Sequence, residues 1–163
     1  MAGGSSQRRT EAQNKELLQD IGNNSNAYTA ENETNFFVNT TPAHLDQAVD
    51  LVSGWVLGAL ITPAEYRREY QVVQRELEMD KGEPDREFWV LSQMNRYRVS
   101  PARVPVIGYQ PVIQSLTRDD VYNYYKMAYV PENMMFSIAG DLDPEVMLAT
   151  VQKYVGDTKP GKV

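Results

Sequence analysis

The sequence predicts an α+β fold in which a small, largely antiparallel sheet is packed with helices. The sheet is predicted by two short segments within the first 40 residues, whose apolar and polar side chains alternate as half-buried strands require. The helices are predicted by later segments, in which apolar residues recur every three or four positions behind residues that commonly begin helices. A chain of 163 residues is long enough to form one domain with its own core.

The first elements are a helix and a hairpin. Residues 7–21 are polar and favour a helix with a weak apolar edge, and residues 22–24 break it. Residues 26–30 and 34–40 are then predicted to be strands, with a polar turn at residues 31–33. Because so few residues separate them, these strands are expected to pair antiparallel.

Five further helices are expected after the hairpin. Thr41-Pro42 and Thr62-Pro63 each place a capping residue before a proline, which fits the first helical position. The predicted helices cover residues 41–60, 62–80, 85–97, 117–128 and 143–154. Between them, the proline-rich residues 100–114 are expected to be loop or short extended structure, and Met134 to Ala139 a third strand.

Composition excludes several classes of function. The net charge of −6 and the lack of a basic stripe argue against a nucleic-acid partner. No apolar run is long enough to cross a bilayer, so no membrane partner is expected. Without cysteine there is no thiolate metal site and no thiol nucleophile. The lack of cysteine does not distinguish a reducing from an oxidising compartment. The single histidine, His44, falls in a polar first turn and is expected to be a surface residue.

The helix at residues 62–80 carries two carboxylates at a spacing that suggests a site. Glu69 and Glu76 are seven residues apart and therefore lie on one edge of the helix. That edge adjoins an apolar stripe made of Tyr66, Tyr70, Val73 and Leu77. Both carboxylates are therefore expected in the buried half of the helix, where they would need a hydrogen bond, an ion pair or a metal. The alternative is a solvated or salt-bridged helix face.

Three segments resemble the pitrilysin/insulinase family of zinc peptidases, the inverzincins. They are NSNAYTAENETNFFVNT, EYRREYQVVQRELEMDKGEPD and VPVIGYQPVIQSLTRDDVYNYYKMAYVPENMMFSIAGDLDPEVM, and LDQAVDLVSGWV lies between the first two. The resemblance covers roughly residues 7–157, in the order and spacing of the family. It implies an αβ sandwich of the LuxS/processing-peptidase-like metallopeptidase type, truncated at its N-terminus.

The resemblance also implies roles for individual residues. In this family an HxxEH helix supplies two histidine ligands and a general base, and a glutamate about 75 residues later supplies the third zinc ligand. Glu76 matches that ligand, and Glu69 matches an outer-shell glutamate that supports the site. Asn26, Ala27 and Tyr28 match the strand that pairs with the extended substrate backbone. The implied chemistry is peptide hydrolysis by a metal-activated water.

The sequence contains no HxxEH, so the first ligand pair is expected upstream of Met1 or absent from the parent protein. Zinc is therefore expected in the full-length protein and not in this chain, which should be inactive alone. Residues 1–6 are expected to be a cloning scar or the start of a fragment, residues 7–157 a truncated N-terminal peptidase half-domain, and residues 158–163 a tail.

The expected function is part of a zinc metalloendopeptidase acting on peptides or presequence-like substrates. The expected partners are the peptide substrate and a second homologous half-domain or subunit, and an exposed sheet edge would allow a strand-mediated dimer. The alternative is a non-catalytic homologue that acts as a binding or assembly subunit of a peptidase complex. A bacterial cytoplasm or periplasm would suit a cysteine-free chain of this type.

Overall fold

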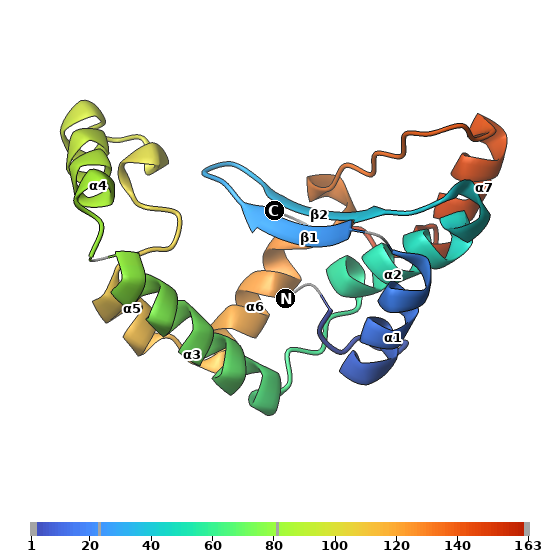
Figure 1. Ribbon diagram of the computed structural model, residues 1–163, viewed down its shortest axis with the longest axis horizontal. Helices are drawn as coiled ribbons and strands as arrows, with labels where there is room; N and C mark the ends of the chain where they lie inside the picture. Colours follow the sequence, from blue (N-terminus) through green and yellow to red (C-terminus); the bar gives the residue numbers. More distant parts are fainter. Residues whose placement is uncertain (1–2, 23, 81, 162–163) are drawn as a thin grey trace.

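The computed structural model describes residues 3–22, 24–80 and 82–161, and it confirms a helix-rich α+β fold with a small antiparallel sheet (Figure 1). The elements are α1 (Glu11–Ile21), β1 (Asn24–Thr29), β2 (Thr34–Asn39), η1 (Pro42–His44), α2 (Leu45–Leu57), α3 (Pro63–Asp80), α4 (Pro84–Arg96), η2 (Pro101–Arg103), α5 (Gln110–Ser115), α6 (Arg118–Ala128), η3 (Pro131–Asn133) and α7 (Pro144–Val155). No helix of the described residues is both long enough and apolar enough to span a bilayer.

The predicted starts of α3 and α6 are confirmed by reciprocal capping. The Thr62 hydroxyl accepts a hydrogen bond from the Glu65 backbone N–H, and the Glu65 carboxylate accepts one from the Thr62 backbone N–H at 2.9 Å. Thr117 and Asp120 form the same box at the start of α6. Each box satisfies two backbone donors that the first helical turn leaves without partners.

Several element boundaries differ from the sequence prediction. The first helix begins at Glu11 rather than at residue 7, because Thr10 caps it. The helix predicted to start at residue 85 begins at Pro84 behind the N-cap Glu83, so Asp85 lies in its first turn. Residues 100–114 are not only loop or short extended structure: Pro111 lies in the first turn of the short helix α5, where its missing N–H costs no hydrogen bond.

The sheet has two strands among the described residues. β1 and β2 pair antiparallel, with Asn24 opposite Asn39 and Thr29 opposite Thr34. The third strand predicted at Met134–Ala139 is wrong for this structure: the segment is extended at Met134 but has no ladder partner. A strand exists only when a neighbour pairs with its backbone, and alternating side chains alone cannot supply one.

The core lies where α1 and α2 meet the hairpin. Ile21, Leu51 and Trp55 form the buried cluster, and Phe36 and Val38 of β2 pack against it. Helix α7 packs along α2, whereas α3 leads away from this body toward α4 and α5 (Figure 1). On α4 large apolar side chains are left open, with Phe88 73% and Leu91 57% exposed.

The segment before α1 is joined to the turn that precedes α3. Ser6 forms a bridge with Ala59, and the Gln7 N–H donates to the Gly58 carbonyl at 2.8 Å. The Ser5 N–H donates to the Glu65 carboxylate at 2.6 Å. Residues 5 and 6 are thus bonded into the same body as the residues that follow them.

Candidate functional site

Helix α3 places Glu69 and Glu76 on one edge, as the sequence predicts. Because α3 is continuous from Pro63 to Asp80, residues seven apart are almost two full turns apart and point in nearly the same direction. The apolar stripe beside them is partly covered: Leu77 is 7% exposed, and the Tyr66 hydroxyl donates to the Leu116 carbonyl at 2.6 Å.

The expected burial of the two glutamates is wrong for this chain. Glu76 is exposed, and the Glu69 side chain is 39% exposed and accepts a hydrogen bond from Arg68 at 3.1 Å. The reason is that α3 makes only sparse contacts with the other described helices and strands, so this edge stays largely open to solvent. The helical wheel gave the correct edge of α3, but no described element covers that edge fully.

The described residues do not by themselves fit a zinc ion. A catalytic zinc takes three protein ligands, and the described part of the chain brings no three His, Asp or Glu side chains close enough to hold a metal. His44 lies in η1, away from α3 in sequence, and its ring contacts Gln47 at 3.1 Å. A carboxylate such as Glu76 is chemically suited to be one ligand of a zinc site but cannot form the site alone.

The predicted substrate strand is the free edge of the hairpin. The Ala30 N–H donates to the Glu33 carbonyl at 2.8 Å, and hydrogen-bonded pairs then alternate along the antiparallel register. This alternation turns the backbone of Ala27 away from β2. Its N–H is instead capped by the side-chain oxygen of Asn26 at 2.8 Å, so the edge is partly closed by its own strand.

The side chains of Asn26 and Tyr28 are exposed on β1. The Tyr28 hydroxyl donates to Glu33 at 3.0 Å, and this hydrogen bond, together with the carboxylate charge, raises the pKa of Tyr28. Asn26, Ala27 and Tyr28 therefore form one group on β1, and Glu69 and Glu76 form another on α3. Within the described residues no hydrogen bond or ion pair joins the two groups.

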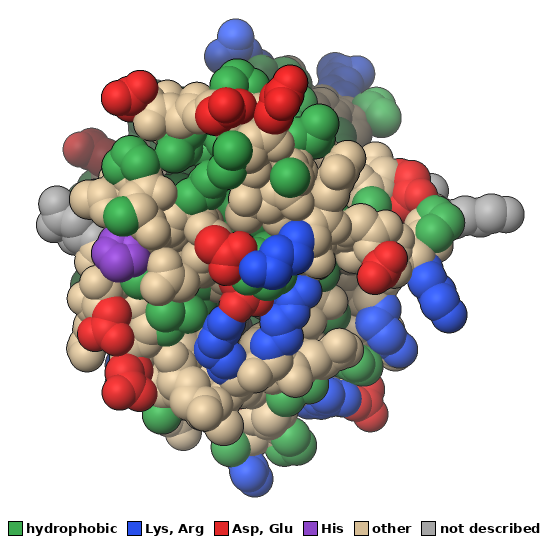
Figure 2. All heavy atoms as spheres, turned by 90° about the vertical axis from the view of Figure 1, so that its right-hand side faces the viewer, with side chains coloured by type: hydrophobic (Ala, Val, Ile, Leu, Met, Phe, Trp, Pro, Cys, Tyr) green, Lys and Arg blue, Asp and Glu red, His purple; other side chains and the backbone are tan. Residues whose placement is uncertain are grey.

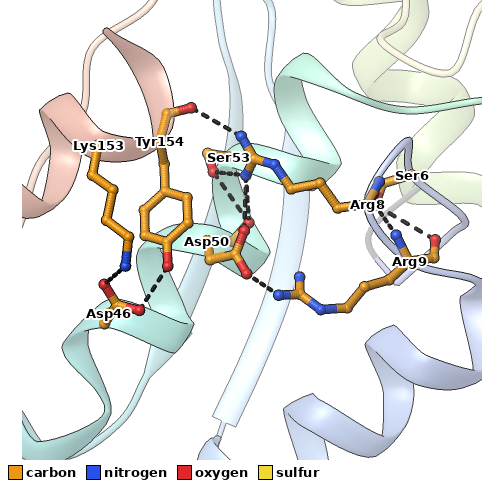
Figure 3. A network of polar contacts seen from close by, with 8 residues as sticks. All are labelled: Ser6, Arg8, Arg9, Asp46, Asp50, Ser53, Lys153 and Tyr154. Carbon is orange, nitrogen blue, oxygen red and sulfur yellow. Dashed lines mark hydrogen bonds and ion pairs between the residues drawn. The ribbon is translucent and has the colours of Figure 1, made fainter.

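Sequence reasoning missed a charged cluster that holds the N-terminal segment. Asp50, 7% exposed on α2, accepts hydrogen bonds from Arg8 at 2.8 Å and from Arg9 (Figure 3). Arg8 also donates to Ser53 at 2.8 Å and to the Tyr154 carbonyl at 2.9 Å, which connects α2 with α7. The available signal was an aspartate within the apolar face of α2 together with two adjacent arginines upstream.

On the face that includes α2 and α7, acidic and basic side chains lie side by side near the centre (Figure 2). A second pair on these two helices joins Lys153 to Asp46 at 2.7 Å, and the Tyr154 hydroxyl also donates to Asp46 (Figure 3). These two hydrogen bonds, the one from Lys153 being the stronger influence, lower the pKa of Asp46. Asp46 and Asp50 are both paired with basic side chains, so this cluster is explained by its role in packing the helices together.

One family is identified by comparison with known proteins. Residues 1–106 match the family described as Insulinase (Peptidase family M16). The chain belongs to this peptidase family. Residues 115–163 of the M16 chain match the family described as Peptidase M16 inactive domain.

Relatives of this M16 chain are named as proteases. An uncharacterized zinc protease from Rickettsia felis is 23% identical over 154 residues, which cover 94% of this chain and 37% of the relative. A probable mitochondrial-processing peptidase subunit beta from Arabidopsis thaliana is 26% identical over 146 residues, which cover 90% of this chain and 28% of the relative. The M16 chain thus spans about a third of the length of these relatives.

The fold is found in solved structures as well. The crystal structure of a protease from Helicobacter pylori matches with a TM-score of 0.90 and 22% identity, covering 96% of this chain and 38% of that one. This likeness confirms the peptidase fold expected from the sequence.

Proposed function

We propose that this chain is part of a zinc metalloendopeptidase that hydrolyses peptides or presequence-like segments. The observation that carries the proposal is the M16 family match together with a helix, α3, that presents Glu69 and Glu76 on one uncovered edge. Such an open edge is expected if another part of the protein supplies the remaining ligands of a metal site.

In this proposal Glu76 is a zinc ligand and Glu69 supports the site from its outer shell. The other ligands and the general base are proposed to be histidines and a glutamate from outside this chain, since the described residues bring no group of three possible metal ligands together. Bound zinc would supply an activated water for attack on the peptide carbonyl. The chain's own contribution is a negative charge that α3 holds in a fixed direction.

The substrate is proposed to lie along β1 as an added strand. The outward N–H and C=O of Ala27 can pair with an extended peptide, and such pairing gives affinity with little demand on sequence. To bind, the peptide must replace the Asn26 side chain on the Ala27 N–H. The exposed Asn26 and Tyr28 side chains would then contact the residues on either side.

The partners proposed are this peptide substrate and a second homologous half-domain or subunit. One relative is named as a subunit beta, and the chain covers only about a third of its relatives, which leaves room for such a second half. The same open edge of β1 would also allow two copies of this chain to pair as a strand-mediated dimer.

The second candidate function is a non-catalytic binding or assembly subunit. It is favoured by the absence of a three-donor cluster among the described residues. It gives no chemical reason for two carboxylates on one edge of α3, and the peptidase proposal does. The two functions differ in whether the longer protein binds zinc through Glu76.

The test uses a longer polypeptide that contains this chain together with the adjoining upstream segment and the second half. Glu76→Gln is compared with Glu78→Gln, which removes an exposed carboxylate two residues away on another side of the same helix. We expect Glu76→Gln to lose zinc and to lower peptide hydrolysis at least about a hundredfold, whereas Glu78→Gln keeps both. Equal zinc content and activity in the two variants would exclude Glu76 as a ligand.

A further inference from the structure

The turn between α2 and α3 holds one side chain in a backbone conformation that such side chains rarely adopt. Ile61 has φ 46°, and no other described residue except glycine has a positive φ. A β-branched side chain crowds its own backbone in this left-handed region, so the conformation persists only where the surroundings enforce it. Ile61 is also buried, at 9% exposed. The neighbours of the turn must therefore hold it in place.

Arg118 of α6 is the neighbour that binds this turn most directly. Its Nε donates to the Ile61 carbonyl at 2.7 Å, and its Nη2 donates to the Leu60 carbonyl at 3.0 Å. One guanidinium thus holds two successive peptide groups, which its planar fork allows and a single ammonium would not. Its Nη1 donates to Asp119 at 3.1 Å, and the guanidinium lies over the Tyr122 ring, 4.3 Å from the centroid. These contacts fix the guanidinium in turn.

The place of Arg118 on α6 also indicates a role in the turn. It is the first residue of α6, where the positive end of the helix dipole disfavours a cation. The capping box of Thr117 and Asp120 fixes the start of α6, and with it the backbone from which Arg118 extends. Further along α6, the Tyr125 hydroxyl accepts a hydrogen bond from the Ala59 N–H at 3.0 Å. Helix α6 therefore binds three consecutive residues of the turn.

The direction of α3 is set largely at this turn. α3 begins at Pro63, two residues after Ile61, and makes only sparse contacts with the other described elements as it leads away (Figure 1). Glu76 lies about 20 Å along the helix axis from Pro63. A tilt of about 10° at the first turn would therefore move Glu76 by about 3 Å. A metal ligand must be held within about 0.5 Å of its productive position, so a small change at the turn is enough to displace it.

We propose that Arg118 is a positioning residue for the zinc site. By binding the carbonyls of Leu60 and Ile61, it fixes the direction in which α3 presents Glu76. This role rests on the proposed function, in which Glu76 is a zinc ligand. Arg118 acts through the turn and touches neither metal nor substrate, so its loss should affect zinc binding and turnover more than substrate binding along β1.

The test compares Arg118→Met with Lys126→Met in the longer protein that contains this chain. The Lys126 ammonium lies over the same Tyr122 ring, 4.9 Å from its centroid, but no described hydrogen bond joins it to the turn. Zinc affinity is measured by competition with a chelator, and kcat and KM for a fluorogenic peptide are measured at saturating zinc. All measurements are made well below the unfolding midpoint of the zinc-free variants, so that global unfolding does not lower the apparent affinity.

We expect Arg118→Met to weaken zinc binding by about tenfold to a hundredfold and to lower kcat by about tenfold, with KM changed less than about twofold. Lys126→Met should change each of these quantities by less than about twofold. Arg118→Lys keeps the charge but can hold the turn only through one ammonium, so it should lie between wild type and Arg118→Met. This milder variant carries the test if Arg118→Met does not fold.

Zinc affinity and kcat that match those of Lys126→Met in the folded Arg118 variants would overturn the positioning role. A rise in KM with unchanged kcat and zinc affinity would overturn it as well. Glu76→Gln separates this role from the proposed function. If Glu76→Gln loses zinc while the Arg118 variants bind it normally, only the positioning role fails. If Glu76→Gln keeps zinc, the ligand assignment fails and the positioning role fails with it.

Discussion

At the scale of single residues, the carboxylates of α3 differ in whether the folded chain buries and pairs them. Glu65 is 4% exposed; burial alone would raise its pKa, but hydrogen bonds from Ser5 and Thr62 outweigh it and lower the pKa to about 2. Glu76 has no such partners among the described residues and is exposed. Both lie on α3, so the difference comes from what surrounds each position and not from the helix.

Glu65→Gln is expected to lower the free energy of unfolding by about 2 to 3 kcal/mol at pH 7, because it weakens three hydrogen bonds to a charged group. Since the folded pKa lies below the ordinary value of 4.5, this stability is fully present above pH 4.5 and is lost as the pH falls toward 2. Urea unfolding at several pH values measures it. A difference between wild type and variant that stays constant from pH 7 to pH 2.5 would contradict the assignment.

Asp50 is the second residue whose surroundings predict a large effect. Asp50→Asn leaves Arg8 and Arg9 partly buried without a charged partner, and we expect it to cost about 3 kcal/mol in unfolding free energy. The matched control is Asp46→Asn, whose side chain is 53% exposed in its pair with Lys153 and should cost less than about 1 kcal/mol. Equal unfolding midpoints for the two variants would show that the buried cluster does not hold the N-terminal segment.

At the scale of elements, the hairpin and the capped helices could be predicted from the sequence because their causes are local. Thr62 with Glu65 and Thr117 with Asp120 bond within one turn, so a few neighbouring residues determine them. The strand at Met134–Ala139 could not be predicted correctly, because its formation depends on a partner far away in the chain.

The free edge of β1 yields a prediction for catalysis by the longer protein. Ala27→Pro removes the outward N–H without removing a ladder hydrogen bond to β2, so the hairpin should persist. If substrate pairs with this edge, KM for peptides should rise about tenfold while kcat changes less. Ala27→Ser keeps the N–H and serves as the control. An unchanged KM in Ala27→Pro would place the substrate elsewhere.

At the scale of the whole molecule, the sequence predicted the fold class and the edge of α3 that carries Glu69 and Glu76, but not the openness of the structure. The helical periodicity of α3 places its residues relative to one another, but it carries no information on which element covers them. The exposed edge of α3, the exposed apolar side chains of α4 and the groove between β2 and residues 135–140 share one feature: no other described element covers them fully. The charged cluster around Asp50 was missed because Arg8 and Asp50 lie 42 positions apart.

In the peptidase proposed above, α3 contributes one ligand to a zinc site that another part of the protein completes. The most direct measurement is zinc per polypeptide after purification and dialysis, made for the 163-residue chain and for the longer protein in parallel. We predict no bound zinc for the 163-residue chain and one zinc for the longer protein. One zinc on the 163-residue chain, or none on the longer protein, would contradict the claim.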